Sequence, residues 1–372
     1  MQGTEASSTP ALLEADRLMI VCNSCRYCEG LCAVFPAMEM RRSFTAGDLR
    51  YFANLCHSCG ACFDDCQFAP PHEFDVNVLK ALAQLRVESY AHYAWPRAAA
   101  GLFQRNGLVI ALTAAVSVAA FLAGFIAWTE PGALFTAHTG SGAFYRLMPH
   151  NLMVVIFGAA LLYAVFAITM GLRAFWRDGG TAGASDYGRA AHDSSTLRYL
   201  DGGGAGCRDD DAPVHDNRRL HHHLTFYGFL LCFASTCVAT VYHYVFGLQA
   251  PYAWYEPPVL LGILGGIGLL IGPVGLLVEK AKRNPVTQEP GQRGMDVGFL
   301  AMLFLTSLTG LALLALRSTP AMGLLLAIHL GVVFGLFITL PYGKFVHGLY
   351  RYAALARYAR ERSSGASSET GH

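Results

Sequence analysis

Long apolar runs dominate the chain after its first hundred or so residues and predict its architecture. Each of six runs spans about 20 residues with few charges, the length an α-helix needs to cross the roughly 30 Å hydrocarbon core of a bilayer. No such run occurs before residue 107. The pattern predicts a small soluble domain followed by six transmembrane helices, over about residues 107–128, 151–172, 224–246, 259–278, 297–316 and 321–345.

Polar segments divide the chain into parts. We expect a flexible N-terminus over residues 1–16, a small ferredoxin-like, α-helical domain over 17–100 and a membrane domain over 101–350. Inside the membrane domain, residues 173–220 form a polar connection of about fifty residues, which is long for a connection between helices. Residues 351–372 form a polar tail. The predicted fold class is therefore α-helical, with a transmembrane bundle behind a soluble domain.

Basic residues are distributed unequally between the two sides of the predicted bundle. The connections after the second and fourth spans and the C-terminal tail hold many Lys and Arg, whereas the opposite connections hold only Arg146 and Arg317. The positive-inside rule places the basic segments in the cytoplasm. Six crossings then put both termini and the soluble domain there, and no secretory signal precedes them. We expect a multi-pass protein of the cell inner membrane.

Eight of the eleven cysteines form two copies of one spacing, C-x2-C-x2-C-x3-C. Three thiolates in one tight turn bind irons of the same [4Fe-4S] cubane, whereas the fourth ligates the other cluster in two-cluster ferredoxins. The spacing therefore predicts two [4Fe-4S] clusters with crossed ligands. One is expected on Cys22, Cys25, Cys28 and Cys66, and the other on Cys56, Cys59, Cys62 and Cys32.

Other uses of these cysteines fit the spacing less well. Structural zinc needs four ligands per ion, with longer gaps between the Cys pairs. A disulfide framework belongs to small secreted domains. In bacterial ferredoxins a proline follows the fourth cysteine, whereas here proline comes later, at Pro36, Pro70 and Pro71. This departure leaves the course of the loops open, but not the ligand set.

Glycine-rich segments occur in two places. The polar connection contains Tyr199-Leu-Asp-Gly-Gly-Gly-Ala-Gly-Cys207, where glycines permit positive φ and close backbone approach. A docking loop and a flexible linker with an incidental thiol are equal alternatives for it, and it lacks the strand-to-helix context of a nucleotide loop. The fourth span carries Gly262-x3-Gly266 and Gly268-x3-Gly272, a spacing typical of close helix packing.

Histidines inside the predicted spans are the next candidates, because ionisable groups at membrane depth are costly and usually functional. His329 and His347 lie eighteen residues apart in the sixth span. In an unbroken α-helix that is five turns, so both would face the same way about 27 Å apart. The antiparallel third span begins with histidines at 221–223 and ends with His243. Two b-type haems with bis-His ligation, one near each membrane face, are predicted.

Helical periodicity ranks the partners for the inner haem. At 3.6 residues per turn, His222 and His243 differ by about 60° around the helix, and His223 and His243 differ by about 160°. His222 or His221 is therefore the expected inner partner of His347.

For the outer haem, His243 is expected opposite His329, with His150 at the start of the second span as its rival. A single haem, or no haem and interfacial histidines, are the alternatives. Quinone is expected near a haem at the membrane face, with Tyr342 and Lys344 as neighbours at the inner end. Lys344 would equally pair with a haem propionate or extend to the interface. Cys232 and Cys237, inside the third span, are expected to be buried small hydrophobes.

Several segments resemble known families. The run from His329 to His347, with Pro341 and Lys344 before the second histidine, resembles the haem-bearing helix of the gamma subunit of respiratory nitrate reductase. Over about residues 17–357 the chain is more similar to the CitB, or tricarballylate-utilisation protein B, family. The matching segments are the two cysteine runs, PPHEF at 70–74, YAWP at 93–96, the loop at 202–207, RRLHHHLTFYGF at 218–229 and the sixth-span run.

The second resemblance implies an electron carrier that serves a separate FAD-dependent dehydrogenase, which oxidises tricarballylate to cis-aconitate. Electrons from the flavin would pass through the clusters and haems to membrane quinone, and no catalytic residue is expected in this chain. Relatives are also linked to cobalamin ring synthesis, so the flavoprotein's substrate stays open. The alternatives are a quinol-oxidising subunit that feeds a soluble reductase, and a redox or iron sensor. A net charge of +1 argues against a nucleic-acid partner.

Overall fold

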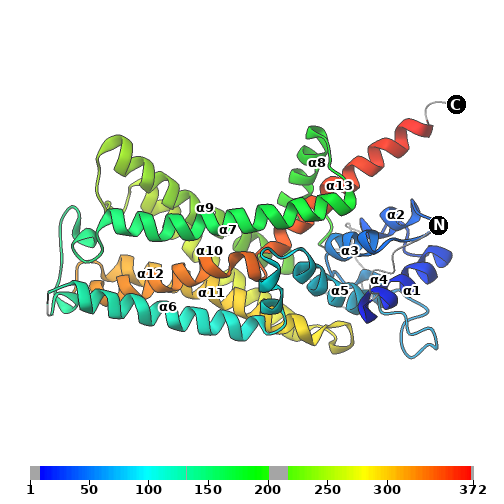
Figure 1. Ribbon diagram of the computed structural model, residues 1–372, viewed down its shortest axis with the longest axis horizontal. Coiled ribbons are helices and arrows are strands. Elements are labelled where there is room, and N and C mark those ends of the chain that lie inside the picture. Colours follow the sequence, from blue (N-terminus) through cyan, green and yellow to red (C-terminus); the bar gives the residue numbers. More distant parts are fainter. Residues whose placement is uncertain (1–8, 131, 201–216, 370–372) are drawn as a thin grey trace.

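The computed structural model describes residues 9–130, 132–200 and 217–369, which form helices and connecting turns with no strand. Long helices lie side by side, and the small N-terminal helices gather at one end of them (Figure 1). The C-terminal helix also points away from the bundle at this end. The predicted fold class, α-helical with a small domain ahead of six apolar helices, is confirmed.

The N-terminal domain consists of five helices: α1 (Pro10–Cys25), α2 (Val34–Glu39), α3 (Ala46–Leu55), α4 (Ala61–Asp64) and α5 (Val78–Tyr93). Local signals explain where two of them begin. Thr9 accepts a hydrogen bond from the Leu12 N–H ahead of α1, and Thr45 and Asp48 form a reciprocal capping box at α3. Tyr51 and Phe52 of α3 are fully buried in the core. The helices therefore pack around one apolar centre from which the cysteine loops emerge.

Six helical segments are long and apolar enough to cross a membrane. Many of their large apolar side chains are exposed, Val116, Leu162 and Phe233 among them. Such a surface is unfavourable in water and matches a lipid environment. The segments are α6 (Asn106–Trp128), α7 (His150–Gly179), α9 (Arg218–Phe246), α10 (Pro257–Lys282), α11 (Pro290–Leu316), and α12 (Met322–Thr339) with its continuation α13 (Val346–Glu369).

The sixth segment is not one straight helix. Helix α12 ends at Thr339, a short 3-10 turn η5 (Leu340–Tyr342) follows, and α13 begins at Val346. Pro341 in this turn lacks an N–H group and its ring clashes with the preceding helical turn, which explains the break. The expectation that His329 and His347 share one face of an unbroken helix is therefore wrong, because they lie on either side of this break.

Glycines allow α9 and α10 to pack with their backbones in contact. A Cβ atom added to Gly265 would lie 2.7 Å from the Gly228 carbonyl oxygen, and one added to Gly268 would lie 2.8 Å from the Leu224 carbonyl oxygen. Atoms that close do not fit, so only glycine permits this approach. The predicted role of the fourth-span glycines in helix packing is consistent with these contacts. Cys237 on α9 is exposed, contrary to expectation, because it lies away from this seam.

The N-terminal domain packs directly on the end of the helical bundle. Tyr90 of α5 stacks on Tyr350 of α13, and Asp48 of α3 binds both Arg41 and Arg357. Helix α8 (Ala184–Ser195), within the polar connection, packs against α13. The Gly202 to Cys207 segment lies outside the described residues. The short 3-10 turns are η1 (Arg97–Phe103), η2 (Ala133–Phe135), η3 (Ala143–Arg146) and η4 (Pro285–Thr287).

Candidate functional site

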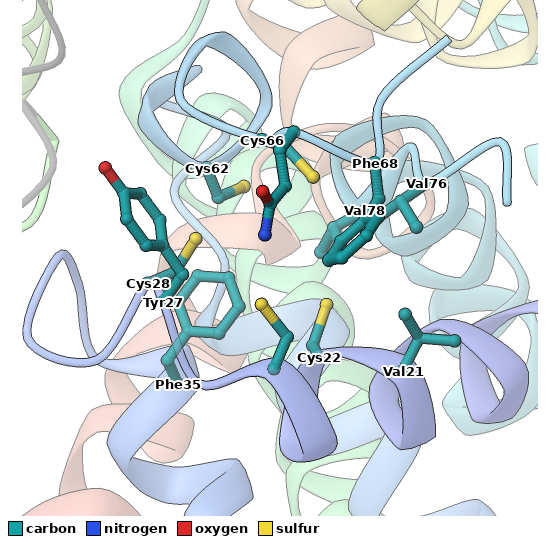
Figure 2. A pocket seen from close by; sticks show the side chains of 12 residues that line it. Val21, Cys22, Tyr27, Cys28, Phe35, Cys62, Cys66, Phe68, Val76 and Val78 are labelled. Carbon is teal, nitrogen blue, oxygen red and sulfur yellow. The ribbon is translucent and has the colours of Figure 1, made fainter. Parts of the chain in front are cut away.

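The first cavity in the N-terminal domain is lined by Cys22, Cys25, Cys28 and Cys66. Cys22 and Cys25 occupy the last turns of α1, and Arg26, with φ of 56°, ends that helix in a left-handed turn that leads to Cys28. Cys66 arrives from the loop after α4. Figure 2 shows the labelled sulfur atoms around a common space, bordered by the apolar side chains Val21, Phe35, Phe68, Val76 and Val78.

The second cavity is lined by Cys32, Cys56, Cys59 and Cys62. Cys62 also borders the first cavity, so the two sites adjoin. Apart from Cys62, which borders both cavities, the cysteines divide between the cavities as in the crossed sets that the spacing predicts. That each set ligates a [4Fe-4S] cluster stays a prediction. Among the described residues, no three His, Cys, Asp or Glu side chains converge tightly enough for a single metal ion.

Burial makes these thiols unfavourable as free thiolates. Together with the neighbouring Cys28 and Cys66, burial raises the pKa of Cys22 to about 12. Burial likewise raises the pKa of Cys28 to about 11 and that of Cys62 well above its usual range. Thiolate ligands become stable when a cationic centre compensates their charge. In each cavity, four sulfur donors around a common space with apolar walls fit an iron-sulfur cluster.

Four arginines that sequence reasoning did not assign to the site surround the start of the second cysteine motif. Arg86 and Arg351 donate to the Cys56 carbonyl oxygen, at 2.7 and 2.9 Å. Arg218 donates to the carbonyl oxygens of His57 and Ser58, and Arg283 donates to that of Ser58. Arg86, Arg351 and Arg218 lie on α5, α13 and α9, and Arg283 directly follows α10. Only their basic character could be seen in the sequence, because their convergence requires the tertiary structure.

The inner histidine pair lies where α9 and α13 meet the N-terminal domain. The ring centres of His222 and His347 are 6.3 Å apart. A metal-imidazole bond is about 2 Å long, and the ring centre lies roughly 1 Å behind the nitrogen, so trans ligands have ring centres about 6 Å apart. Nδ1 of His347 bonds to the Lys344 carbonyl oxygen, an arrangement typical of metal-ligating histidines. Nδ1 of His222 is buried without a hydrogen-bond partner. The pair fits an axially ligated haem iron.

The other two histidines of the triplet point elsewhere. A Cβ atom added to Gly275 of α10 would lie within 2.4 Å of three ring atoms of His221, so this ring packs on α10. The ring of His223 lies 5.6 Å from that of Tyr227 on its own helix. Of the two expected inner partners, only His222 has its ring beside His347.

The outer histidines do not form the expected pair. The rings of His150 and His243 stack on each other with centres 3.7 Å apart, which is too short for an iron between them. His329 instead bonds through Nδ1 to the Thr309 hydroxyl and packs over Gly310 of α11. No contact between His329 and His150 or His243 is found among the described residues. The expected placement of His243 opposite His329 is therefore not seen, because His329 lies on the α11-facing side of α12.

Both expected quinone neighbours have internal partners. Lys344 forms an ion pair with Asp296 at 2.7 Å, and Lys280 binds the same carboxylate. The hydroxyl of Tyr342 bonds to Tyr163 and to the Trp95 carbonyl oxygen. Lys344 thus neither extends to the interface nor lies free for a propionate. Asp296 was missed because a single acid near the start of an apolar helix gives no distinctive pattern.

Two family models together cover most of the chain. The model described as Citrate utilization protein B Fer4-like domain matches residues 15–92, and the Citrate utilization protein B model matches residues 101–368. The chain belongs to the citrate utilization protein B family. Citrate utilization protein B of Escherichia coli is 50% identical over 355 residues, 95% of this chain and 93% of that protein. No solved structure matches the chain.

Membership of the citrate utilization protein B family agrees with the site geometry. The Fer4-like match spans all eight cysteines that line the two cavities. The second match contains the six helices that can cross a membrane and the inner histidine pair. The chain is thus a helical membrane protein with an iron-sulfur type N-terminal domain.

Proposed function

We propose that this chain is a membrane electron carrier that passes electrons from a partner FAD-dependent dehydrogenase to quinone. The observation that carries the proposal is the succession of redox-type donor sets. Two adjoining cysteine-lined cavities lie in the N-terminal domain, and the His222 and His347 pair lies where that domain meets the membrane helices. Cofactors bound at these sites would form a path for electrons from the N-terminal domain to the membrane.

Each cavity would hold one [4Fe-4S] cluster, through Cys22, Cys25, Cys28 and Cys66 in the first and Cys32, Cys56, Cys59 and Cys62 in the second. An iron-sulfur cluster supplies one-electron transfer without atom transfer. The exposed Cys25 favours the first cavity as the entry point from a soluble donor. The buried Cys56 favours the second as the site nearer the membrane.

The inner haem is assigned to His222 and His347. Its support is the ring separation and the Lys344 carbonyl oxygen that fixes the His347 ring. A second, outer haem stays a prediction for His329 with His243 or His150. It requires the stacked rings of His150 and His243 to separate, because they leave no room for iron as they stand.

The partner and its substrate follow from the family. The Escherichia coli relative is named for citrate utilisation, and the resemblance drawn from the sequence points to tricarballylate. Both are tricarboxylates, so we assign the partner flavoprotein to oxidation of a tricarboxylate. A two-electron reduced flavin would give up its electrons one at a time, and quinone would take up two electrons and two protons. The basic ends of α7, α9 and α10 support an orientation in which the N-terminal domain lies in the cytoplasm, beside the inner membrane.

The proposal is tested on the purified full-length protein in lipid nanodiscs. Iron, acid-labile sulfide and pyridine haemochrome assays should give two [4Fe-4S] clusters and b-type haem. A reduced flavoprotein partner should reduce a water-soluble quinone analogue only when this chain is present. His347→Ala should abolish that reduction, while His138→Ala, at a half-buried histidine between α6 and α7, should retain it. Quinone reduction that persists without haem would contradict the route, and a chain without clusters would contradict the function.

A further inference from the structure

Four guanidinium groups from separate parts of the chain donate to the backbone of the segment Cys56-His57-Ser58. Arg86 and Arg351 both donate to the carbonyl oxygen of Cys56, the first cysteine of the second motif. Arg86 also donates to the Ala53 carbonyl oxygen and the Ser58 hydroxyl. Fixed positive charge therefore lies beside the second cavity, at Cys56 and His57 of its lining.

Arg86 is a buried cation and Arg351 a partly buried one, and neither has a carboxylate partner among the described residues. The side chain of Arg86 is almost completely buried, with the residue 3% exposed. Nε of Arg351 is buried and has no hydrogen-bond acceptor. Neither guanidinium forms an ion pair with any carboxylate among the described residues. A buried charge is costly unless an opposite charge compensates it, and Cys56 of the second set acts electrostatically on Arg351.

The charge near the first cavity differs in sign. The carboxylate of Asp65 acts electrostatically on Cys28, and Cys25 is exposed to solvent. An added negative charge is therefore disfavoured by an acid in the first cavity and favoured by two cations in the second.

Helix α13 connects this cationic shell to the inner histidines. His347 and Arg351 are four residues apart on α13, so they share one face of the helix. Arg351 interacts electrostatically with both His347 and His222 while it donates to Cys56. The second cavity and the inner histidine pair thus share Arg351 as a common neighbour.

We propose that Arg86 and Arg351 raise the reduction potential of the second cluster above that of the first, and so direct electrons from the first cluster to the second and on to the inner haem. The inference rests on the proposed function. In the step, one electron leaves the first cluster and one enters the second, with no proton transferred. Reduction adds one negative charge, which the guanidinium groups stabilise. Burial opposes this effect, but a low dielectric also strengthens the attraction of two full charges at short range.

The test is an EPR-monitored redox titration of the full-length protein. Arg351→Gln should lower the reduction equilibrium constant of the second cluster about tenfold, which is about 59 mV for a one-electron couple, and leave the first cluster unchanged. Arg351→Lys keeps the charge and should restore most of the potential. Arg105→Gln, which removes an exposed arginine at the start of α6, is the matched control and should change neither cluster. An unchanged second potential in Arg351→Gln would overturn the inference.

Arg86→Gln distinguishes an effect on the cluster's potential from an effect on the haem potential. Arg86 acts at the second cavity from α5, so its loss should lower the second cluster's potential without moving the haem potential. Loss of Arg351 should also lower the haem potential, because Arg351 is near both inner histidines. A first-cluster shift equal to the second-cluster shift would contradict a local effect.

The order of the two potentials can be read even if these variants do not fold. Cys25→Ala should remove the first cluster, and the surviving signal should then be the higher of the two parental potentials. In the reciprocal Cys59→Ala protein the lower one should survive. The reverse result would overturn the inference and leave the electron-carrier function intact, whereas a parent without clusters would overturn the function itself.

Discussion

At the scale of single residues, the cavity that a side chain reaches matters more than the motif that contains it. Cys66 belongs to the second cysteine run, yet it lines the cavity of Cys22, Cys25 and Cys28. The same distinction applies to the histidines, because three neighbours in sequence point to three different places. Substitutions at adjacent positions should therefore have quite different effects.

The crossed cysteine sets give a direct prediction. Cys66→Ser should remove or destabilise the cluster of the first cavity and spare that of the second, because its sulfur lines the first cavity. EPR spectra and iron content of the purified variant would measure this. Cys237→Ser, at an exposed position on α9, should leave both clusters intact. Loss of only the second-cavity cluster in Cys66→Ser would show that the ligands are not crossed.

The inner haem site gives a second prediction at this scale. His222→Ala or His347→Ala should remove one haem, because a metal-ligating imidazole is hard to replace without loss of the metal. His221→Ala should keep that haem, since its ring packs on Gly275 of α10. Pyridine haemochrome assays distinguish these outcomes. A loss of haem in His221→Ala together with its retention in His222→Ala would transfer the ligand role to His221.

At the scale of helices, close packing and one break determine where the functional groups lie. The break at Pro341 separates α12 from α13 and lets α13 continue over the N-terminal domain. Helix α9 packs chiefly on α10 through glycines. The position of His222 thus depends on the α9 and α10 seam rather than on α9 alone.

The seam can be tested with a single methyl group. The Cβ atom of Gly265→Ala would lie 2.7 Å from the Gly228 carbonyl oxygen and 2.8 Å from the Cys232 nitrogen. The helices must separate to accept it, so we expect a loss of about 1 to 3 kcal/mol, typical of overpacking. Thermal unfolding and haem retention in nanodiscs would report this loss.

The matched control for the seam is Gly124→Ala on α6, where an added Cβ atom meets nothing within 4 Å. That variant should be neutral or slightly more stable, because alanine favours a helix by up to about 1 kcal/mol over glycine. Equal stability of the Gly265 and Gly124 variants would show that α9 and α10 can accept the extra methyl group without loss of stability.

At the scale of the whole molecule, the N-terminal domain and the helical bundle share one core. Buried residues of α1, α3 and α5 belong to the same apolar cluster as Tyr350 and Ala354 of α13. A network of Arg41, Asp48, Arg357 and Glu361 adds ion pairs across the junction. Electron transfer between the cavities and the inner histidines depends on this junction remaining closed.

The junction should weaken in acid. Burial raises the pKa of Asp48, but hydrogen bonds from Thr45 and the charges of Arg41 and Arg357 outweigh it, so its pKa lies below the usual 3.8. A lowered pKa in the folded state means that the stabilisation is complete above this usual value and is lost as the pH falls through the folded-state pKa. Hydrogen exchange in α3 as a function of pH would measure the opening of the junction.

Variants isolate the contribution of Asp48 from general acid damage. Asp48→Asn should weaken the junction at neutral pH and show a smaller change on acidification than the parent. Glu14→Gln, which removes an exposed ion pair with Arg17, should behave as the parent does. An identical acid response in the parent and Asp48→Asn would assign the response to other groups.

The sequence by itself determined the helical fold class, the six apolar segments and the two cysteine sets. These features are local: an apolar run of sufficient length must span or be buried, and a C-x2-C-x2-C turn gathers its own sulfurs. The crossed sets could be inferred because the fourth cysteine of each motif follows the first three by a short, fixed distance. His222 was among the inner partners that helical periodicity favoured.

Only the tertiary structure decided which distant side chains meet. Helical periodicity assumed that the sixth segment is unbroken, but Pro341 separates His329 from His347 and packing turns His329 toward Gly310. Arg86 and Arg351 meet at Cys56, although they lie 30 and 295 positions from it in the sequence. No local pattern encodes such a meeting, because it results from how α5 and α13 pack together, and buried charge near a redox site is a property of that packing rather than of any segment alone.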